Sequence, residues 1–301
     1  MLTRRLISAA VIISTMLLIL FLDFWLGTDA VLSRPGLVLS VLALTTVLLA
    51  AGELADMFSN AASRVDARVL ALASFAMVLV TCVPVLWDDY PADCALGRFG
   101  FSLSGVVVGF VVLIFMEMVS FQGETDVRGE IVDRIGRGAL TLIYLNMLFA
   151  FLLNHRFLNG DNRLGLLAIV TLITTVKLSD ASAYFAGKSY GRRKMAPKLS
   201  PGKTIEGAIG GFVGGCAGAL IVIYLVGPWL FQTNVDKAWW WVLIYGVLVT
   251  AAGMFGDLAE SLIKRDTHTK DSSRWLPGLG GILDVVDSLV FAAPVSYLLW
   301  I

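Results

Sequence analysis

Long apolar runs separated by short polar segments dominate this chain. A helix needs about 20 mostly apolar residues to cross a membrane, and nine runs approach that length. They cover residues 6–27, 36–58, 68–87, 102–121, 137–155, 164–187, 205–227, 239–263 and 281–301. The pattern predicts an all-α fold, a polytopic integral membrane bundle of about nine transmembrane helices.

Two of these runs have a second interpretation. Residues 6–27 resemble the core of a secretory signal peptide, but the run is longer than a usual signal core and no clear small-x-small cleavage site follows it. We interpret it as an uncleaved first span. The run 205–227 is rich in glycine, which is more typical of closely packed membrane helices than of a phosphate loop.

The composition agrees with a membrane protein. Of the 301 residues, 57% are hydrophobic and 15% are charged, and the mean hydropathy is +0.81. Soluble domains are about half apolar and about a quarter charged. Cys82, Cys94 and Cys216 are widely spaced, so they indicate neither a disulfide framework nor a zinc site. The formal net charge is zero, and we expect no nucleic-acid partner.

The basic residues orient the predicted bundle. Most of the 23 Lys and Arg residues fall on one side of it when the N-terminus is placed in the cytoplasm. We therefore predict a cytoplasmic N-terminus, a C-terminus outside, and cytoplasmic positions for the polar loops 188–204 and 264–280. The chain divides into N-terminal helices, 1–160, and a C-terminal part, 161–301, that carries the polar motifs.

The first polar motif is "SPGKT", residues 200–204, directly before the run that starts at residue 205. We expect a turn that places Ser200, Lys203 and Thr204 near a helix N-terminus, where backbone N–H groups and a lysine attract anions. It is similar to the end of a P-loop, but the upstream glycine spacing is absent and no strand is predicted before it. This segment taken alone favours the alternative, a basic loop that touches lipid headgroups.

The second motif is "GMFGDLAESLIKR", residues 253–265. Asp257, Glu260, Ser261 and Lys264 recur at helical spacing, so they form one polar face. A polar stripe on a spanning helix is expected to face the bundle interior. The alternative is an internal ion-pair network that only fixes packing, and it applies more to Glu260 and Lys264 than to Asp257.

The third motif is "KDSSRWLPGLGGILDVVD", residues 270–287. Asp284 and Asp287 are three residues apart, so they share one face of the last helix. Gly280 and Gly281 precede them in a turn whose backbone can approach a ligand closely. Aspartates at helix starts often only cap the helix, which explains one aspartate better than two.

Together the three motifs gather carboxylates and basic side chains at one cytoplasmic rim. Carboxylates bind a hard cation such as Mg²⁺, which bridges phosphates, and basic side chains would hold the remaining phosphate charge. His155 and His268 fall on opposite predicted sides and indicate no metal site. The residues therefore indicate metal-assisted phosphate chemistry at the inner membrane face.

The segment "SLIKRDTHTKDSSRWLPGLGGILDVVD", residues 261–287, resembles the signature of the phosphatidate cytidylyltransferases, also called CDP-diacylglycerol synthases. The segment 180–207 is similar to an upstream block of that family, and the nine-span layout fits it. Two positions depart from the signature: Leu279 stands where the family has His, and Val285 where it has Arg. We expect both to be tolerated, because the acidic and basic positions of the signature remain.

The resemblance implies transfer of a cytidylyl group from CTP to phosphatidate, giving CDP-diacylglycerol and diphosphate for phospholipid synthesis. It implies Mg²⁺ as the cofactor, with a second monovalent or divalent cation left open, and Asp257, Asp284 and Asp287 as metal ligands. These aspartates and Lys264 are the predicted catalytic residues. The predicted substrate-binding residues are Ser200, Lys203, Thr204, Ser261, Arg265, Lys270, Asp271, Gly280 and Gly281.

The expected partners are CTP, phosphatidate and membrane lipids, and a homodimer is left open. The expected location is the cytoplasmic membrane, with the active site on its cytoplasmic side. Two other functions remain as alternatives. A secondary transporter also has glycine-containing spans and buried charges, and an inactive family member would bind only lipid or nucleotide.

Overall fold

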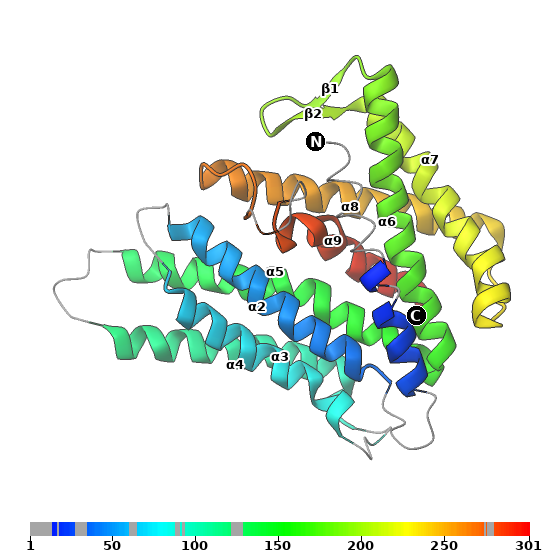
Figure 1. Ribbon diagram of the computed structural model, residues 1–301. Helices are drawn as coiled ribbons and strands as arrows, with labels where there is room; N and C mark the ends of the chain where they lie inside the picture. The colour runs from blue at the N-terminus through cyan, green and yellow to red at the C-terminus, as the bar shows by residue number, and fades with distance from the viewer. Residues whose placement is uncertain are drawn as a thin grey trace. The chain divides into compact units, whose positions relative to one another are not determined.

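The structure is a computed structural model of the chain, and it describes residues 14–16, 18–27, 35–59, 65–87, 91, 94–121, 129–273, 275 and 280–301. The described chain is mostly helical (Figure 1). Packing divides it into two units: unit 1 comprises Met1–Leu153 and Asp266–Val285, and unit 2 comprises Asn154–Arg265 and Val286–Ile301. This division does not test the predicted segments 1–160 and 161–301, which are defined by where the polar motifs lie.

Unit 1 is built mainly from four helices, coloured blue to green in Figure 1: α2 (Leu37–Ser59), α3 (Ala67–Leu86), α4 (Gly97–Ser120) and most of α5 (Glu130–Arg156). Small residues bring α3 and α4 together. A Cβ atom added at Gly109 would lie only 2.8 Å from the carbonyl oxygen of Ala73. Such close backbone approach is typical of packed membrane helices.

Unit 2 contains α6 (Asn162–Tyr190), α7 (Ile205–Ile221), α8 (Trp239–Asp266) and most of α9 (Ile282–Trp300), with the short 3₁₀ helix η2 (Leu158–Gly160) before α6 and the π-helical segment η3 (Val222–Phe231) after α7. Several glycines of α7 face α6. A Cβ atom at Gly214 would overlap Ser182, and one at Gly210 would overlap Ala186. The prediction that this glycine-rich helix packs closely is confirmed.

A small hairpin joins α6 to α7. It consists of β1 (Lys194–Ala196) and β2 (Ser200–Thr204), which pair antiparallel. The expectation that "SPGKT" is a turn without a strand is wrong, because this segment is itself the second strand and the turn lies earlier, at residues 197–199. Thr204 ends β2 and also caps α7, since its Oγ1 accepts a hydrogen bond from the Gly207 N–H at 3.0 Å.

The first turn of α7 holds the base of this hairpin. Glu206 accepts hydrogen bonds from the backbone N–H groups of Arg192 at 3.0 Å and Arg193 at 3.2 Å. Glycine at position 191 makes room for the cap, because a Cβ atom there would lie 2.9 Å from Thr204 Oγ1. The hairpin therefore has a defined position relative to the N-terminus of α7.

The helix α5 begins earlier than its apolar run. The sequence predicts a span from residue 137, whereas the helix begins at Glu130. Ion pairs at i,i+4 spacing explain the extra turns: Arg137 contacts Asp133 at 2.9 Å, and Arg134 lies 3.9 Å from Glu130. Polar side-chain pairs therefore continue this helix beyond its hydrophobic segment.

The described helices are those of a membrane protein. Eight of them are long and apolar enough to cross a membrane, and the apolar helix Ser14–Gly27 is shorter. The predicted first span, 6–27, begins in residues outside the described part of the chain. Helix α4 exposes large apolar side chains, including Leu103, Phe115 and Met118, an arrangement suited to lipid contact. The predicted integral membrane helix bundle is confirmed.

Unit 2 also contains a buried polar network. Ser296 Oγ lies 2.9 Å from His155 Nε2 and 2.8 Å from the Tyr245 hydroxyl. All three side chains are fully buried. A serine hydroxyl has one hydrogen and two lone pairs, so it can donate to one neighbour and accept from the other. Ser296 thereby links helices α5, α8 and α9.

Replacing this serine is expected to destabilise the protein. Ser296→Ala removes the hydroxyl that both His155 and Tyr245 contact, and such a loss in a buried site costs about 1–3 kcal/mol. The matched control is Ser74→Ala, because Ser74 Oγ is buried without a hydrogen-bond partner among the described residues. Thermal unfolding in detergent should show a lower midpoint for Ser296→Ala only; equal midpoints would contradict the role of the network.

Candidate functional site

Two of the polar motifs meet in unit 2 through an ion pair. The ammonium group of Lys203, on β2, lies 2.6 Å from a carboxylate oxygen of Asp257, on α8. Both side chains are partly exposed, 22% for Lys203 and 35% for Asp257. Because Thr204 caps α7, the neighbouring Lys203 has a defined position. The hairpin thus places its lysine on the polar face of α8.

Two further carboxylates, Asp180 and Asp287, lie near this pair. Asp180, on α6, lies within electrostatic range of Asp257, Asp287 and Lys203, and its carboxylate is 3.8 Å from the Lys177 ammonium. The carboxylates come from three different helices of unit 2, α6, α8 and α9. Like charges at short range repel unless cations lie among them. This carboxylate cluster of Asp180, Asp257 and Asp287 is therefore suited to cations.

Asp287 is the buried member of the cluster. Its Oδ1 accepts hydrogen bonds from the backbone N–H and the hydroxyl of Ser288 at 2.5 and 2.9 Å, and Asp287 also lies near Glu260 on α8. Glu260 in turn accepts from Lys264 at 2.9 Å. The interpretation of an internal ion pair thus holds for Glu260 and Lys264, and the catalytic role of Lys264 stays a prediction.

The carboxylate of Asp284 lies in unit 1, in the first turn of α9. Its Oδ2 accepts three hydrogen bonds: from the Ser272 N–H at 3.0 Å, the Ser272 hydroxyl at 2.7 Å and the Gly281 N–H at 2.7 Å. Asp284 therefore holds Ser272 and Gly281 beside the first turn of α9. These contacts agree with the alternative interpretation of Asp284, in which an aspartate at the start of a helix caps that helix.

A second carboxylate, from α2, reaches the same segment. Glu53 accepts from the hydroxyls of Ser272 and Ser273 at 3.0 and 2.8 Å, and from the backbone N–H groups of Ile282 and Leu283, each at 2.9 Å. Its side chain is only 8% exposed. The sequence interpretation assigned this residue no role.

The two carboxylates explain the glycine pair before α9. Gly280 has φ +91°, and a Cβ atom there would overlap Asp284 Oδ2. A Cβ atom at Gly281 would overlap both Glu53 and the Ser272 hydroxyl. The glycines are therefore required by side chains of the protein itself, in addition to any approach to a ligand.

Four further predicted site residues lie at the end of α8 or shortly after it. Arg265 Nε donates to the Leu199 carbonyl at 3.2 Å, so the end of α8 is bonded to the hairpin turn within unit 2. Ser261 is half-buried on α8, and Lys270 and Asp271 are exposed after that helix. The residues of the third motif that lie outside the described part of the chain are Arg274, Leu276, Pro277, Gly278 and Leu279.

The predicted metal ligands belong to different units. Asp257 and Asp287 lie in unit 2, whereas Asp284 lies in unit 1. The structure brings Asp257 and Asp287 within electrostatic range of Asp180. The prediction that Asp257 and Asp284 jointly bind one cation stays a prediction.

The carboxylate cluster of unit 2 has the chemistry that Mg²⁺ requires. Among the described residues, no three or more His, Cys, Asp or Glu side chains form a group that could hold a metal ion by themselves. Mg²⁺ is usually bound by one or two carboxylates together with water and substrate phosphates. Asp257 and Asp180 are partly exposed, and Asp257 already has the ammonium group of Lys203 beside it. These residues therefore fit a cation shared with a phosphate ligand.

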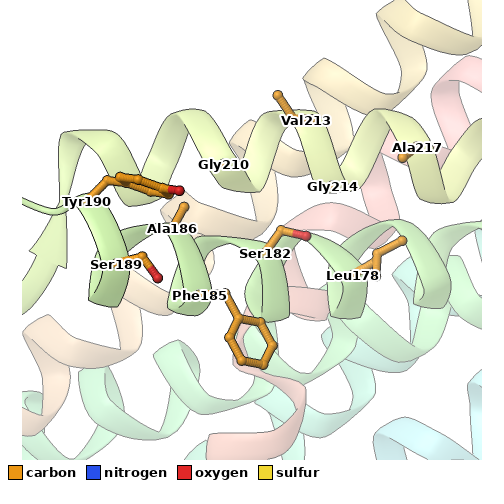
Figure 2. Close-up of a pocket in the computed structure, with 10 residues that line it drawn as sticks. All are labelled: Leu178, Ser182, Phe185, Ala186, Ser189, Tyr190, Gly210, Val213, Gly214 and Ala217. Carbon is orange, nitrogen blue, oxygen red and sulfur yellow. The ribbon is translucent and has the colours of Figure 1, made fainter.

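An apolar groove of about 550 Å³ lies between α6 and α7 (Figure 2). Leu178, Phe185 and Val213 line it, and Ser182 and Tyr190 are among its few polar side chains. None of the predicted catalytic or substrate-binding residues lines this groove. The polar cluster and the groove are therefore separate features of unit 2.

Sequence reasoning left two of these carboxylates out of the predicted site, Glu53 and Asp180. Both lie inside apolar runs that were predicted as spans. An ionisable residue inside a span is expensive and usually has a partner or a function, and this signal alone would have selected both. The donors to Glu53 are remote in sequence, and so are Asp257 and Asp287, which lie near Asp180, so the pattern along the chain does not identify these contacts.

Comparison with known proteins gives a family match over nearly the whole chain. The family described as "Cytidylyltransferase family" matches residues 3–301. The chain is 43% identical over 146 residues to the phosphatidate cytidylyltransferase of Brucella abortus, a match that covers 48% of this chain and 51% of the relative. With the phosphatidate cytidylyltransferase of Bacillus subtilis, identity is 38% over 169 residues, covering 56% of this chain and 58% of the relative.

A further relative is an Escherichia coli protein named "Uncharacterized protein YnbB". It is 43% identical over 133 residues, which cover 44% of this chain and 42% of the relative. The chain thus spans about half the length of the curated relatives it matches.

The contact between Gly281 and the two side chains beside it can be tested by substitution. Gly281→Ala is expected to destabilise the protein by about 1–3 kcal/mol, because the added methyl group overlaps Glu53 and Ser272. The control is Gly52→Ala on α2, where a Cβ atom meets nothing within 4 Å. Thermal unfolding in detergent should show a lower midpoint for Gly281→Ala alone. A midpoint equal to that of the control would refute the close contact.

Proposed function

This chain belongs to the cytidylyltransferase family, and on that premise we propose that it transfers a cytidylyl group from CTP to phosphatidate. The products would be CDP-diacylglycerol, for phospholipid synthesis, and diphosphate. Two relatives that carry the name phosphatidate cytidylyltransferase support this choice of substrates. The polar motifs of residues 180–287 support it independently, because they combine carboxylates with basic side chains.

The observation that carries the proposal is the ion pair between Lys203 and Asp257, with Asp180 nearby. A nucleoside triphosphate and a lipid phosphate are both strongly anionic, so binding them together requires several positive charges. A lysine beside several carboxylates offers one positive charge directly, and the carboxylates offer a binding position for a cation. This arrangement supports a reaction between two phosphates.

In the proposed reaction, an oxygen of the phosphatidate phosphate attacks the α-phosphorus of CTP. A new P–O bond forms, the bond between the α-phosphorus and the bridging oxygen breaks, and diphosphate leaves with the bonding electrons. The nucleophile is already an anion, so no Ser/His/Asp triad is required. Positioning and charge neutralisation supply the rate enhancement. Lys203, Arg265 and Lys270 are proposed to hold phosphate charge.

The proposed metal ligands are Asp257, Asp284 and Asp287, and Asp180 joins them because it lies within electrostatic range of Asp257 and Asp287. Bound Mg²⁺ would neutralise negative charge on the phosphates during the transfer. The surrounding helices and the hairpin hold these side chains in place.

We also propose that the protein resides in the cytoplasmic membrane with its active site on the cytoplasmic side, where CTP is available. The basic loops support this orientation. The hairpin and the residues before it expose Arg192, Arg193, Lys194 and Lys198, as expected for a segment at the cytoplasmic surface.

Two alternatives compete with this proposal. A secondary transporter is disfavoured by the family membership, although charged residues inside spans are common to both classes. A member that only binds lipid or nucleotide is supported by the two departures from the signature, Leu279 and Val285. Turnover measured on the purified protein separates these alternatives.

The first test of the proposal is enzymatic. Purified protein with labelled CTP, phosphatidate and Mg²⁺ should form CDP-diacylglycerol, and Asp257→Asn should lower kcat by about 100-fold or more. The control is Asp133→Asn, which loses an exposed ion pair with Arg137 and should leave kcat unchanged. Product formation that is equal for the unmodified protein and Asp257→Asn would support the binding-only alternative.

The second test concerns orientation. In a variant whose three native cysteines are replaced, Lys198→Cys places a thiol in the exposed hairpin turn. We expect a membrane-impermeant maleimide to label it in inside-out vesicles and not in intact cells. A cysteine introduced at Ile301, also exposed, should show the opposite pattern. Labelling of position 198 from outside would reverse the proposed topology.

A further inference from the structure

The glutamate on α2 accepts four hydrogen bonds within unit 1. Each of its oxygens accepts two of them: Oε1 from Ser273 and Ile282, and Oε2 from Ser272 and Leu283. Two of these donors are backbone N–H groups and two are hydroxyls. Both oxygens of Glu53 are therefore occupied by donors from residues 272–273 and from the first two residues of α9.

These contacts cap the N-terminus of α9. The first N–H groups of a helix have no partner inside the helix, and they attract negative charge. Gly281, the residue before α9, has no side chain with which to cap it. The carboxylate of Glu53 accepts from the N–H groups of Ile282 and Leu283 instead. An anion from a different helix thus fixes where α9 begins.

The same carboxylate is linked to Asp284 through one hydroxyl. Ser272 Oγ lies 3.0 Å from Glu53 Oε2 and 2.7 Å from Asp284 Oδ2. A hydroxyl has a single hydrogen, so the two carboxylates share one donor. Asp284 is held further by the N–H groups of Ser272 and Gly281, whose positions depend on the residues that Glu53 anchors.

We propose that Glu53 is a positioning residue for Asp284. From α2 it anchors residues 272–273 and 282–283, and through Ser272 it sets the orientation of the Asp284 carboxylate. This inference rests on the proposed function, in which Asp284 is a metal ligand. It also assigns a role in the reaction to the N-terminal helices, which contain none of the predicted site residues.

The substitution Glu53→Gln tests the anchor with almost no change in size. Each oxygen of Glu53 accepts two hydrogen bonds, so either orientation of the amide places its NH₂ group against a backbone N–H and a serine hydroxyl. The matched control is Glu117→Gln, since Glu117 is also buried, at 6% exposure, and is paired with Arg134 at 3.0 Å in the same unit. Removal of a buried charge is therefore common to both variants.

Two measurements on the full-length protein in nanodiscs separate positioning from general stability. The first is the rate of trypsin cleavage after the exposed Lys270, followed by mass spectrometry, which reports release of the neighbouring chain without any need for activity. The second is kcat together with the Mg²⁺ concentration that gives half-maximal rate. Partners of metal ligands typically change affinity or activity by about 10- to 100-fold.

We expect Glu53→Gln to speed cleavage after Lys270, to lower kcat by about 10- to 100-fold and to raise the Mg²⁺ requirement, with a smaller change in KM for CTP. Glu53→Asp, which keeps the charge, should recover part of the loss. Glu117→Gln should behave as the unmodified protein does. A folded Glu53→Gln variant with unchanged cleavage and kcat would overturn the proposal, as would equal losses in both glutamine variants.

If Glu53→Gln does not fold, Ser273→Ala takes its place, because it removes one of the four donors. Faster cleavage with lower kcat would support the anchor, and unchanged values of both would overturn it. Failure of the proposed function looks different. In that case the unmodified protein forms no CDP-diacylglycerol, while the cleavage rates still distinguish the Glu53 and Glu117 variants.

Discussion

A carboxylate inside an apolar helical protein must be surrounded by hydrogen-bond donors or by positive charge, since burying an unpaired charge is very unfavourable. This requirement organises the polar parts of both units. In unit 1, Glu53 and Asp284 gather backbone N–H groups and serine hydroxyls around the start of α9. In unit 2, Asp257 is paired with Lys203. The hairpin, the glycine pair and the helix starts are arranged around these contacts.

The two units satisfy the requirement in different ways, with different chemical consequences. Four fixed donors bind Glu53, so its position is rigid and its oxygens are fully used. Asp257 is partly exposed and its partner is a lysine, a flexible side chain with a compact charge. Under the proposed function, such a partner would turn toward a phosphate when the nucleotide binds. The first arrangement suits an anchor and the second suits a site that exchanges partners.

Glycine has a corresponding role in each unit. At Gly280 and Gly281 the absence of a side chain lets two carboxylates approach the backbone. At Gly210 and Gly214 it lets α7 pack against α6, so the helix that begins at the end of β2 is held firmly. Close packing of the helices thus supports the position of Lys203, just as Glu53 supports the position of Asp284.

The sequence by itself determined the membrane class, nearly all of the spans and the signature motifs, because length, hydropathy and spacing are local properties of the chain. It also indicated the Glu260–Lys264 pair as one of two interpretations, since these residues are neighbours on one helix. Only the tertiary structure decided that "SPGKT" is a strand, that Lys203 pairs with Asp257, and that Asp180 lies near that pair. The contact between Glu53 and Ser272 joins residues 219 positions apart. Two of the donors to Glu53 are backbone N–H groups, which every residue except proline carries, so no pattern of side chains along the chain could have revealed them.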